Sequence, residues 1–159
     1  MPWSPRARLN TWTDMEIITH TTRGTTKASI EVLNDMTTTF AKALRLESSC
    51  YCLQLYCMPN LLRDFNRKGA VTITGNRQIT ALIDSKLLRD KEALATVLAH
   101  EMVHVKQFVK GQLVQKKGTG NHPPKNYWMG KLNKKSYFER PWELEAFGRQ
   151  QILANMVAV

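Results

Sequence analysis

The segment HEMVH at residues 100–104 contains the residue types that hold a catalytic metal ion. Residues four apart lie about one turn from each other on the same side of an α-helix, so His100 and His104 can present two imidazoles to one ion. Zinc suits such ligands, and a third protein ligand would leave the fourth position for water. Glu101 would lie beside the ion and take a proton from that water as it attacks a peptide carbonyl. The pattern predicts zinc-dependent peptide hydrolysis without a covalent intermediate.

The third ligand must lie outside this motif. In the metzincin class of zinc peptidases the motif continues as HExxHxxGxxH, but here Gln107 stands where the glycine belongs and Lys110 where the last histidine belongs. That class is therefore excluded. The remaining candidates are Glu143, Glu145 and His122.

Helical spacing separates the two glutamates. At about 100° per residue, Glu143 projects among small and apolar side chains such as Ala146 and Ala154, whereas Glu145 lies towards the margin of the same helix. A carboxylate placed amid small and apolar side chains indicates a ligand more than a solvated charge. This argument favours Glu143 and leaves Glu145 and His122 open.

The segment LAHEMVHVKQ, followed by YWMG and then by YFERPWELEAFG, resembles the small gluzincin-like metallopeptidases encoded by bacteriophages and some microbes. The resemblance covers roughly the C-terminal 70 residues. It implies a zincin-like fold and a zinc-binding glutamate at the first glutamate of the ExEA helix, which is Glu143 here.

A second, competing resemblance is to SprT and Spartan proteases, which act near DNA and use a later histidine as third zinc ligand. The corresponding residue would be His122, in GNHPPKNYW. The two prolines directly after His122 prevent the regular helix on which that family places its histidine. The basic charge of the chain suits this alternative, and the prolines weaken it.

A zinc peptidase also needs a donor for the oxyanion that forms during attack. Tyr137, Tyr127 or His122 could supply it, and we rank Tyr137 first because it lies close to Glu143 in the sequence. The resemblance to these peptidases further implies that the strand expected at residues 78–84 pairs with an extended substrate by β-addition.

The elements that position these residues are predicted from hydrophobic periodicity and capping signals. We expect helices at residues 27–46, capped by Thr25 or Thr26, at 91–111 after Asp90, and at 141–157 with Pro141 in the first turn. Strands are expected at 50–58 and 70–85, with a turn at Gly75 and Asn76, and a long loop at 112–137 with one short strand. The prediction is an α+β, zincin-like fold: a small, mostly antiparallel sheet packed on the first helix and the HEMVH helix, with a C-terminal helix carrying the third ligand.

Length and composition limit the alternatives. The 159 residues predict one domain, 1–159, with residues 1–25 as an extended N-terminal segment. The three cysteines are too few and too close for a disulfide framework, and without a signal peptide or membrane span we expect a cytoplasmic protein. The net charge of +10 predicts non-specific association with nucleic acid beside a protein or peptide substrate. A zinc-stabilised nucleic-acid-binding module without catalysis is the alternative from another functional class. Oligomeric state is not predicted.

Overall fold

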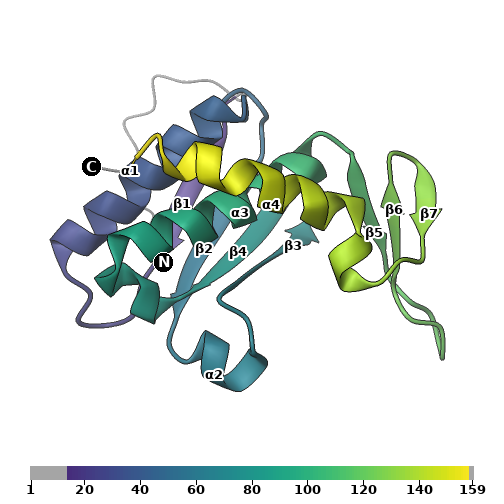
Figure 1. Cartoon of the computed structure of the whole chain (residues 1–159), viewed down its shortest axis with the longest axis horizontal. Helices are drawn as coiled ribbons and strands as arrows, with labels where there is room; N and C mark the ends of the chain where they lie inside the picture. The colour runs from purple at the N-terminus through teal and green to yellow at the C-terminus, as the bar shows by residue number, and fades with distance from the viewer. Residues whose placement is uncertain (1–13, 158–159) are drawn as a thin grey trace.

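The computed structural model describes residues 14–157, which form four α-helices, two short 3-10 helices and two β-sheets (Figure 1). The α+β class predicted from the sequence is confirmed. Within the predicted N-terminal extended segment, residues 1–13 lie outside the described residues, and Glu16–His20 form strand β1.

The larger sheet has the strand order β1-β2-β4-β3, in which β2 is Cys52–Met58, β4 is Gln78–Asp84 and β3 is Gly69–Gly75. Strands β1, β2 and β4 are parallel, and only β3 runs antiparallel to its neighbour. The prediction of a mostly antiparallel sheet is therefore wrong for this sheet. Only the β3–β4 hairpin could be predicted from its turn sequence, because parallel pairing follows from crossover connections rather than from a local motif.

Helix α1, Lys27–Ala43, makes the crossover between the parallel strands β1 and β2. It begins at Thr26, whose hydroxyl accepts a hydrogen bond from the Ser29 backbone N–H at 3.1 Å. Its inner face buries Leu33 and Phe40 completely. The helix predicted here is thus confirmed, with Thr26 rather than Thr25 as the cap.

Helix α3, Lys91–Val109, is the longest element and packs on the same core. Asp90 caps it by accepting from the Ala93 N–H at 3.1 Å, and Gly111 follows its end with a positive φ of 70°. Two short helices, α2 at Leu61–Phe65 and η1 at Ser85–Arg89, flank strands β3 and β4. One face of β4 is buried beneath the helices through Ile79, Ala81 and Ile83.

The region predicted as a loop with one strand contains three strands instead. Strands β5 (Leu113–Lys116), β6 (Lys125–Trp128) and β7 (Lys131–Asn133) form a second, antiparallel sheet. Met129 and Gly130 connect β6 to β7 with φ angles of 51° and 84°. Two positive φ angles in a two-residue connection are typical of a type I′ hairpin turn, which a Met-Gly pair signals only weakly.

Helix α4, Pro141–Ala154, follows the 3-10 helix η2, Tyr137–Glu139, and lies alongside α3 (Figure 1). Pro141 occupies the first turn, as predicted, where its missing N–H leaves no hydrogen bond unmade. The fully buried Ala146 lets the two helices approach closely. The pairing of α3 with α4 places the HEMVH motif opposite the first turn of α4. None of the described helices is long and apolar enough to cross a membrane.

Candidate metal centre

Three potential ligand atoms, two from α3 and one from α4, point at one another. His100 Nε2 lies 3.1 Å from Glu143 Oε1, His104 Nε2 lies 3.3 Å from the same oxygen, and the two Nε2 atoms are 3.2 Å apart. A tetrahedral zinc ion with bonds of about 2.0–2.1 Å separates its ligand atoms by about 3.3–3.4 Å. The triangle of side chains thus has the dimensions of three corners of a zinc site.

A buried amide determines which nitrogen of His104 carries the proton. The Gln107 side chain donates from Nε2 to the Trp142 carbonyl and to Glu145 Oε1, both at 2.9 Å. Its Oε1 therefore faces His104 Nδ1, 2.8 Å away, and must accept a hydrogen bond from it. With the proton on Nδ1, neutral His104 presents the lone pair of Nε2 to the centre of the triangle.

His100 is held in the same way by α4. Its Nδ1 lies 2.8 Å from Gln150 Oε1, and the Phe147 ring packs edge-on against the imidazole with ring centroids 4.7 Å apart. Hydrogen bonds of this kind select the tautomer of a metal-ligating histidine and fix the plane of its ring. Both histidines are thereby oriented with Nε2 towards Glu143.

Three electron pairs at this spacing repel one another unless a cation lies among them. Burial raises the pKa of Glu143, but the hydrogen bonds that His100 and His104 donate when a proton occupies Nε2 outweigh it and hold that pKa well below its usual range. Burial lowers the pKa of His104, but the hydrogen bond to Glu143 and the charge of Glu101 outweigh it, so the His104 pKa is raised. A proton or a metal ion between the three ligand atoms would remove this repulsion. The donor set of two imidazoles and a carboxylate fits a divalent metal ion.

Glu101 lies beside the triangle, 6% exposed, against strand β3. Its Cγ and Oε1 occupy the space in which a Cβ on Gly69 would lie, at 2.8 and 2.9 Å from that position. Burial raises the pKa of this carboxyl above its ordinary value, although the charges of His104 and His100 act in the opposite direction. A carboxylate with a raised pKa is suited to accept and return a proton.

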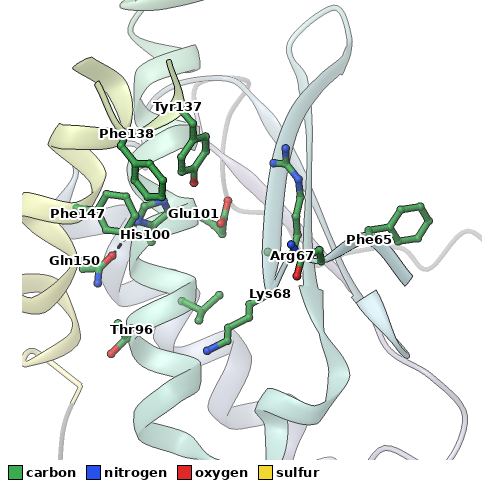
Figure 2. Close-up of a pocket in the computed structure, with 13 residues that line it drawn as sticks. Phe65, Arg67, Lys68, Thr96, His100, Glu101, Tyr137, Phe138, Phe147 and Gln150 are labelled. Atoms are coloured by element: carbon green, nitrogen blue, oxygen red, sulfur yellow. Dashed lines mark hydrogen bonds between the residues drawn. The ribbon is translucent and has the colours of Figure 1, made fainter. Parts of the chain in front are cut away.

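Tyr137 lies across the cleft on η2 and donates a hydrogen bond to Glu143 Oε1 at 3.2 Å. Figure 2 shows Tyr137, Phe138 and Phe147 on one side of the cleft and Arg67 on the other, with His100 and Glu101 between them. The cavity in this view has a volume of about 710 Å³. A smaller cavity of about 160 Å³ lies against the same His100 and Glu101 and also reaches His104 and Glu143.

The other sequence candidates lie elsewhere. His122 is exposed in the loop before β6 and does not belong to the cluster. Glu145 accepts hydrogen bonds from the buried Lys106 at 2.7 Å and from Gln107, so its carboxylate links α4 to α3. The Tyr127 ring packs under the Lys116 ammonium, 4.9 Å away. Of the three, only Glu145 supports the cluster, through Gln107.

The substrate strand predicted from the sequence is wrong. Strand β4, residues 78–84, is hydrogen-bonded on both sides, by β2 and by β3, and cannot accept another strand. The edge of the sheet beside the cleft is β3. The sequence places β4 directly before the metal helix, but proximity along the chain does not reveal the lateral order of strands.

Sequence reasoning missed three residues that position the site: Gln107, Gln150 and Gly69. In the sequence, Gln107 and Gln150 are distinguished from ordinary surface amides only by the helix face on which they lie. Gln107 follows His104 by three residues, and Gln150 follows Glu143 by seven, so each shares a helix face with a ligand. That spacing was the available signal. Nothing local to Gly69 indicates a contact with Glu101, 32 residues later in the chain.

Comparison with protein families gives an independent result. A family model, Peptidase_M91, described as effector protein, matches residues 20–148. The chain belongs to this peptidase family. The M91 match runs from the last residue of β1 to the middle of α4, so it includes all three residues of the cluster and Glu101. No curated protein matches the chain.

Membership of M91 and the HExxH motif with a glutamate on a second helix identify the chain as a member of a metallopeptidase class. The predicted resemblance to small gluzincin-like peptidases is confirmed at this level. The bacteriophage origin that accompanied it stays a prediction.

Proposed function

We propose that this chain is a zinc-dependent endopeptidase, with His100, His104 and Glu143 as metal ligands and Glu101 as general base. The observation that carries the proposal is the triangle of ligand atoms, in which hydrogen bonds to Nδ1 leave both Nε2 lone pairs facing a buried carboxylate. Two imidazoles and one carboxylate are a donor set of catalytic zinc sites in peptidases, which keep a fourth position open.

Zinc, when bound, would acidify a water molecule and polarise the peptide carbonyl. Glu101 would accept the proton of that water and later deliver it to the amine that leaves. The raised pKa of Glu101 supports the delivery of the proton to the leaving amine, because the carboxyl group can remain protonated between the two proton transfers. The peptide C–N bond breaks without a covalent bond to the protein.

Tyr137 would stabilise the negative charge that develops on the carbonyl oxygen. Its hydroxyl lies in the cleft within hydrogen-bond distance of a ligand atom of Glu143, so a small rotation would redirect it to the substrate. A preorganised donor of this kind lowers the barrier by an electrostatic contribution that water cannot match. The role of Tyr137 as a catalytic residue rests on this placement.

The shape of the cleft supports cleavage within a chain rather than at its end. Cavities lie on both sides of the site, and both are lined by His100, Glu101 and Tyr137. A peptide can therefore continue past the reacting bond in both directions. Since the matched family is described as effector proteins, we further propose that the chain works as an effector. Its cytoplasmic location stays a prediction.

The alternatives raised by the sequence receive less support. The SprT-like arrangement would need His122 at the metal, but His122 lies outside the cluster. Non-specific nucleic-acid association rests on the net charge of +10 alone. A zinc-stabilised module without catalysis would not require a carboxylate such as Glu101 to be held in the cleft beside the metal ligands.

The test compares the zinc-loaded protein with its Glu101→Gln variant on denatured casein, together with metal analysis of both. Both should bind about one zinc ion per chain, and the variant should cleave about 10²–10⁴-fold more slowly because the base is lost. Glu139→Gln is the matched control, since Glu139 is an exposed glutamate on η2 outside both cavities. Equal cleavage by wild type and Glu101→Gln would contradict the role of Glu101. Zinc binding without any cleavage would favour the non-catalytic module.

A further inference from the structure

Three cavities on the surface adjoin one another, and the middle one lies at the proposed metal centre. The large cavity and the small one share five lining residues: Arg67, Gly69, His100, Glu101 and Tyr137. The small one shares Asn126, Arg140 and Trp142 with a third cavity of about 270 Å³, which lies between the second sheet and the start of α4. A substrate that crosses the site therefore has a continuous path into this third cavity.

The lining of this path is strongly cationic. Its basic residues are Arg67, Lys68, Lys125, Lys134, Lys135 and Arg140. The only carboxylates that line it are Glu101 and Glu143, and both belong to the proposed reaction centre. The third cavity contains four of the cations and no acidic residue. Outside the reaction centre the path carries charge of a single sign.

In the described part of the chain these cations are not paired with carboxylates, although the charge of Arg67 acts to lower the pKa of Glu101. Across residues 14–157, none of the six forms an ion pair with a carboxylate. By contrast, Lys106 and Arg149, on α3 and α4 outside the path, both pair with Glu145. Clustered cations repel one another, so an unpaired cluster lowers stability slightly and attracts anions.

Arg140 is the residue best placed to bind a substrate side chain, because it lines both the small cavity and the third one. Its guanidinium lies 5.7 Å from the ring centroids of both Tyr137 and Trp142. Such contacts orient the planar group, and within the described part of the chain its terminal nitrogens bond to no other side chain. A guanidinium held in this way can bind a carboxylate or phosphate through two parallel hydrogen bonds.

We propose that the substrate is an extended peptide with an acidic run on one side of the cleaved bond, bound by Arg140 together with Lys134 and Lys135. This inference rests on the proposed peptidase function and names the substrate class of the same site. The shared chemistry is an anionic side chain, either a carboxylate or a phosphorylated residue. The third cavity is the subsite that recognises it.

Nucleic acid is the competing polyanion, and the structure favours a peptide. Single-stranded nucleic acids bind on exposed aromatic faces on which bases stack. The Trp142 side chain of the third cavity is only 5% exposed. The cavity also adjoins a centre suited to peptide hydrolysis rather than lying on a separate face. The third cavity thus offers charge without an exposed aromatic face, which favours acidic side chains of a flexible peptide, whereas the exposed rings of Phe65, Phe138 and Phe147 line the large cavity.

The experiment measures binding rather than cleavage, using the zinc-loaded Glu101→Gln protein so that the peptides stay intact. Fluorescein-labelled peptides of equal length carry a run of four glutamates, of four phosphoserines, of four glutamines or of four lysines, and their anisotropy is followed at low and at physiological salt. The glutamate peptide should bind about tenfold or more tightly than the glutamine peptide, because charge-assisted hydrogen bonds to a carboxylate are roughly twice as strong as those to a neutral amide. Tighter binding of phosphoserine than of glutamate would support the same subsite and assign phosphate as its ligand.

Two variants localise the effect. In the Glu101→Gln background, Arg140→Gln should abolish the preference for glutamate over glutamine, and Lys134→Gln/Lys135→Gln, at two exposed residues, should reduce it. The matched control is Lys27→Gln/Lys42→Gln, which removes the same charge from exposed sites on α1 and should retain the preference.

Three results would overturn the inference: equal binding of all four peptides, equal loss in the α1 control, or displacement of the glutamate peptide by oligothymidine at a lower concentration than by unlabelled peptide. The last would assign the cavity to nucleic acid. Casein cleavage by the unmodified enzyme is a separate measurement, so a failure of the proposed peptidase function remains distinguishable from a failure of this one.

Discussion

Gly69 lies directly against Glu101, so closely that a Cβ on the glycine would lie 2.8 Å from Glu101 Cγ. Real Cβ atoms essentially never approach another atom this closely, so the side chain of any other residue would displace the carboxylate or the strand. No described residue donates a hydrogen bond to Glu101. The contact with the β3 backbone at Gly69 is therefore part of what fixes the proposed base beside the metal ligands.

The first prediction follows from this contact. Gly69→Ala should lower kcat/KM by about 10²-fold, because a displacement of the order of 1 Å at a reacting group can cost that much. Zinc stoichiometry should be unchanged, since the three atoms nearest to a Cβ at Gly69 all belong to Glu101 and none to a metal ligand. The measurement is peptide cleavage kinetics together with metal analysis.

Gly75→Ala provides the control on the same strand. A Cβ at Gly75 would meet nothing closer than Gln78 Cβ at 3.5 Å, which is an ordinary contact. This variant should retain most of the activity. If both alanine variants lose activity equally, the loss reflects the strand and not the position of Glu101.

The parts of the fold that were predictable have local causes. The HEMVH spacing, the caps at Thr26 and Asp90, and Pro141 in the first turn of α4 each depend on residues within about one helical turn. Such signals can be recognised in the sequence because helix geometry determines which nearby side chains contact one another. The pairing of His100 and His104 on one side of α3 follows directly from that geometry.

The parts that were not predictable depend on contacts between distant segments. Parallel pairing of β1 with β2 is decided by the path of α1, and the contact of Gly69 with Glu101 by the lateral order of strands. Gln107 illustrates the point most clearly. The sequence showed only that it is not the metzincin glycine, whereas its hydrogen bonds to Trp142 and Glu145 arise from helix packing.

The second prediction concerns Gln107. Gln107→Leu replaces the amide with an apolar side chain of similar size and removes the acceptor for His104 Nδ1, so the imidazole is no longer held in one tautomer. Zinc affinity should fall by about 10–100-fold, the usual effect of losing such a partner. Competition against a chromogenic chelator measures this constant. Gln151→Leu on the exposed face of α4 should leave it unchanged, and an unaltered affinity in Gln107→Leu would mean that the hydrogen bond does not orient the ligand.

The third prediction separates Tyr137 from the alternative donor Tyr127. Tyr137→Phe should lower kcat by about 10²–10³-fold, as expected when one oxyanion donor is lost, with little change in KM or in zinc affinity. Tyr127 lies on β6 with its ring against Lys116 of β5, so Tyr127→Phe, which removes only the hydroxyl, should have almost no effect. A fall in zinc affinity without a fall in kcat of the fully loaded enzyme would show instead that Tyr137 only supports Glu143.

The fourth prediction concerns stability and pH in the metal-free protein. Burial raises the pKa of Glu101 above its ordinary value of 4.5, so the folded chain keeps this proton to a higher pH than the unfolded chain does. Ionising Glu101 in the folded state therefore costs stability, and this cost is absent below pH 4.5 and grows as pH rises towards the folded-state pKa. Glu101→Gln cannot ionise, so the metal-free variant should unfold at a higher temperature than wild type at pH 7. Each 1 kcal/mol of relief corresponds to roughly 2–4 °C in Tm for a chain of this size.

The difference in Tm between Glu101→Gln and wild type should shrink as the pH is lowered from 7 to 4, because wild-type Glu101 is then protonated in both states. Thermal unfolding followed by circular dichroism in the presence of a chelator measures both ends of this range. Glu139→Gln, at an exposed position, should show no such trend. A variant less stable than wild type at pH 7 would mean that the Glu101 carboxylate is stabilised in the metal-free fold. Glu101 would then not lower the stability of the metal-free protein. A buried carboxylate at this position could in that case be explained by folding stability alone, without a role in catalysis.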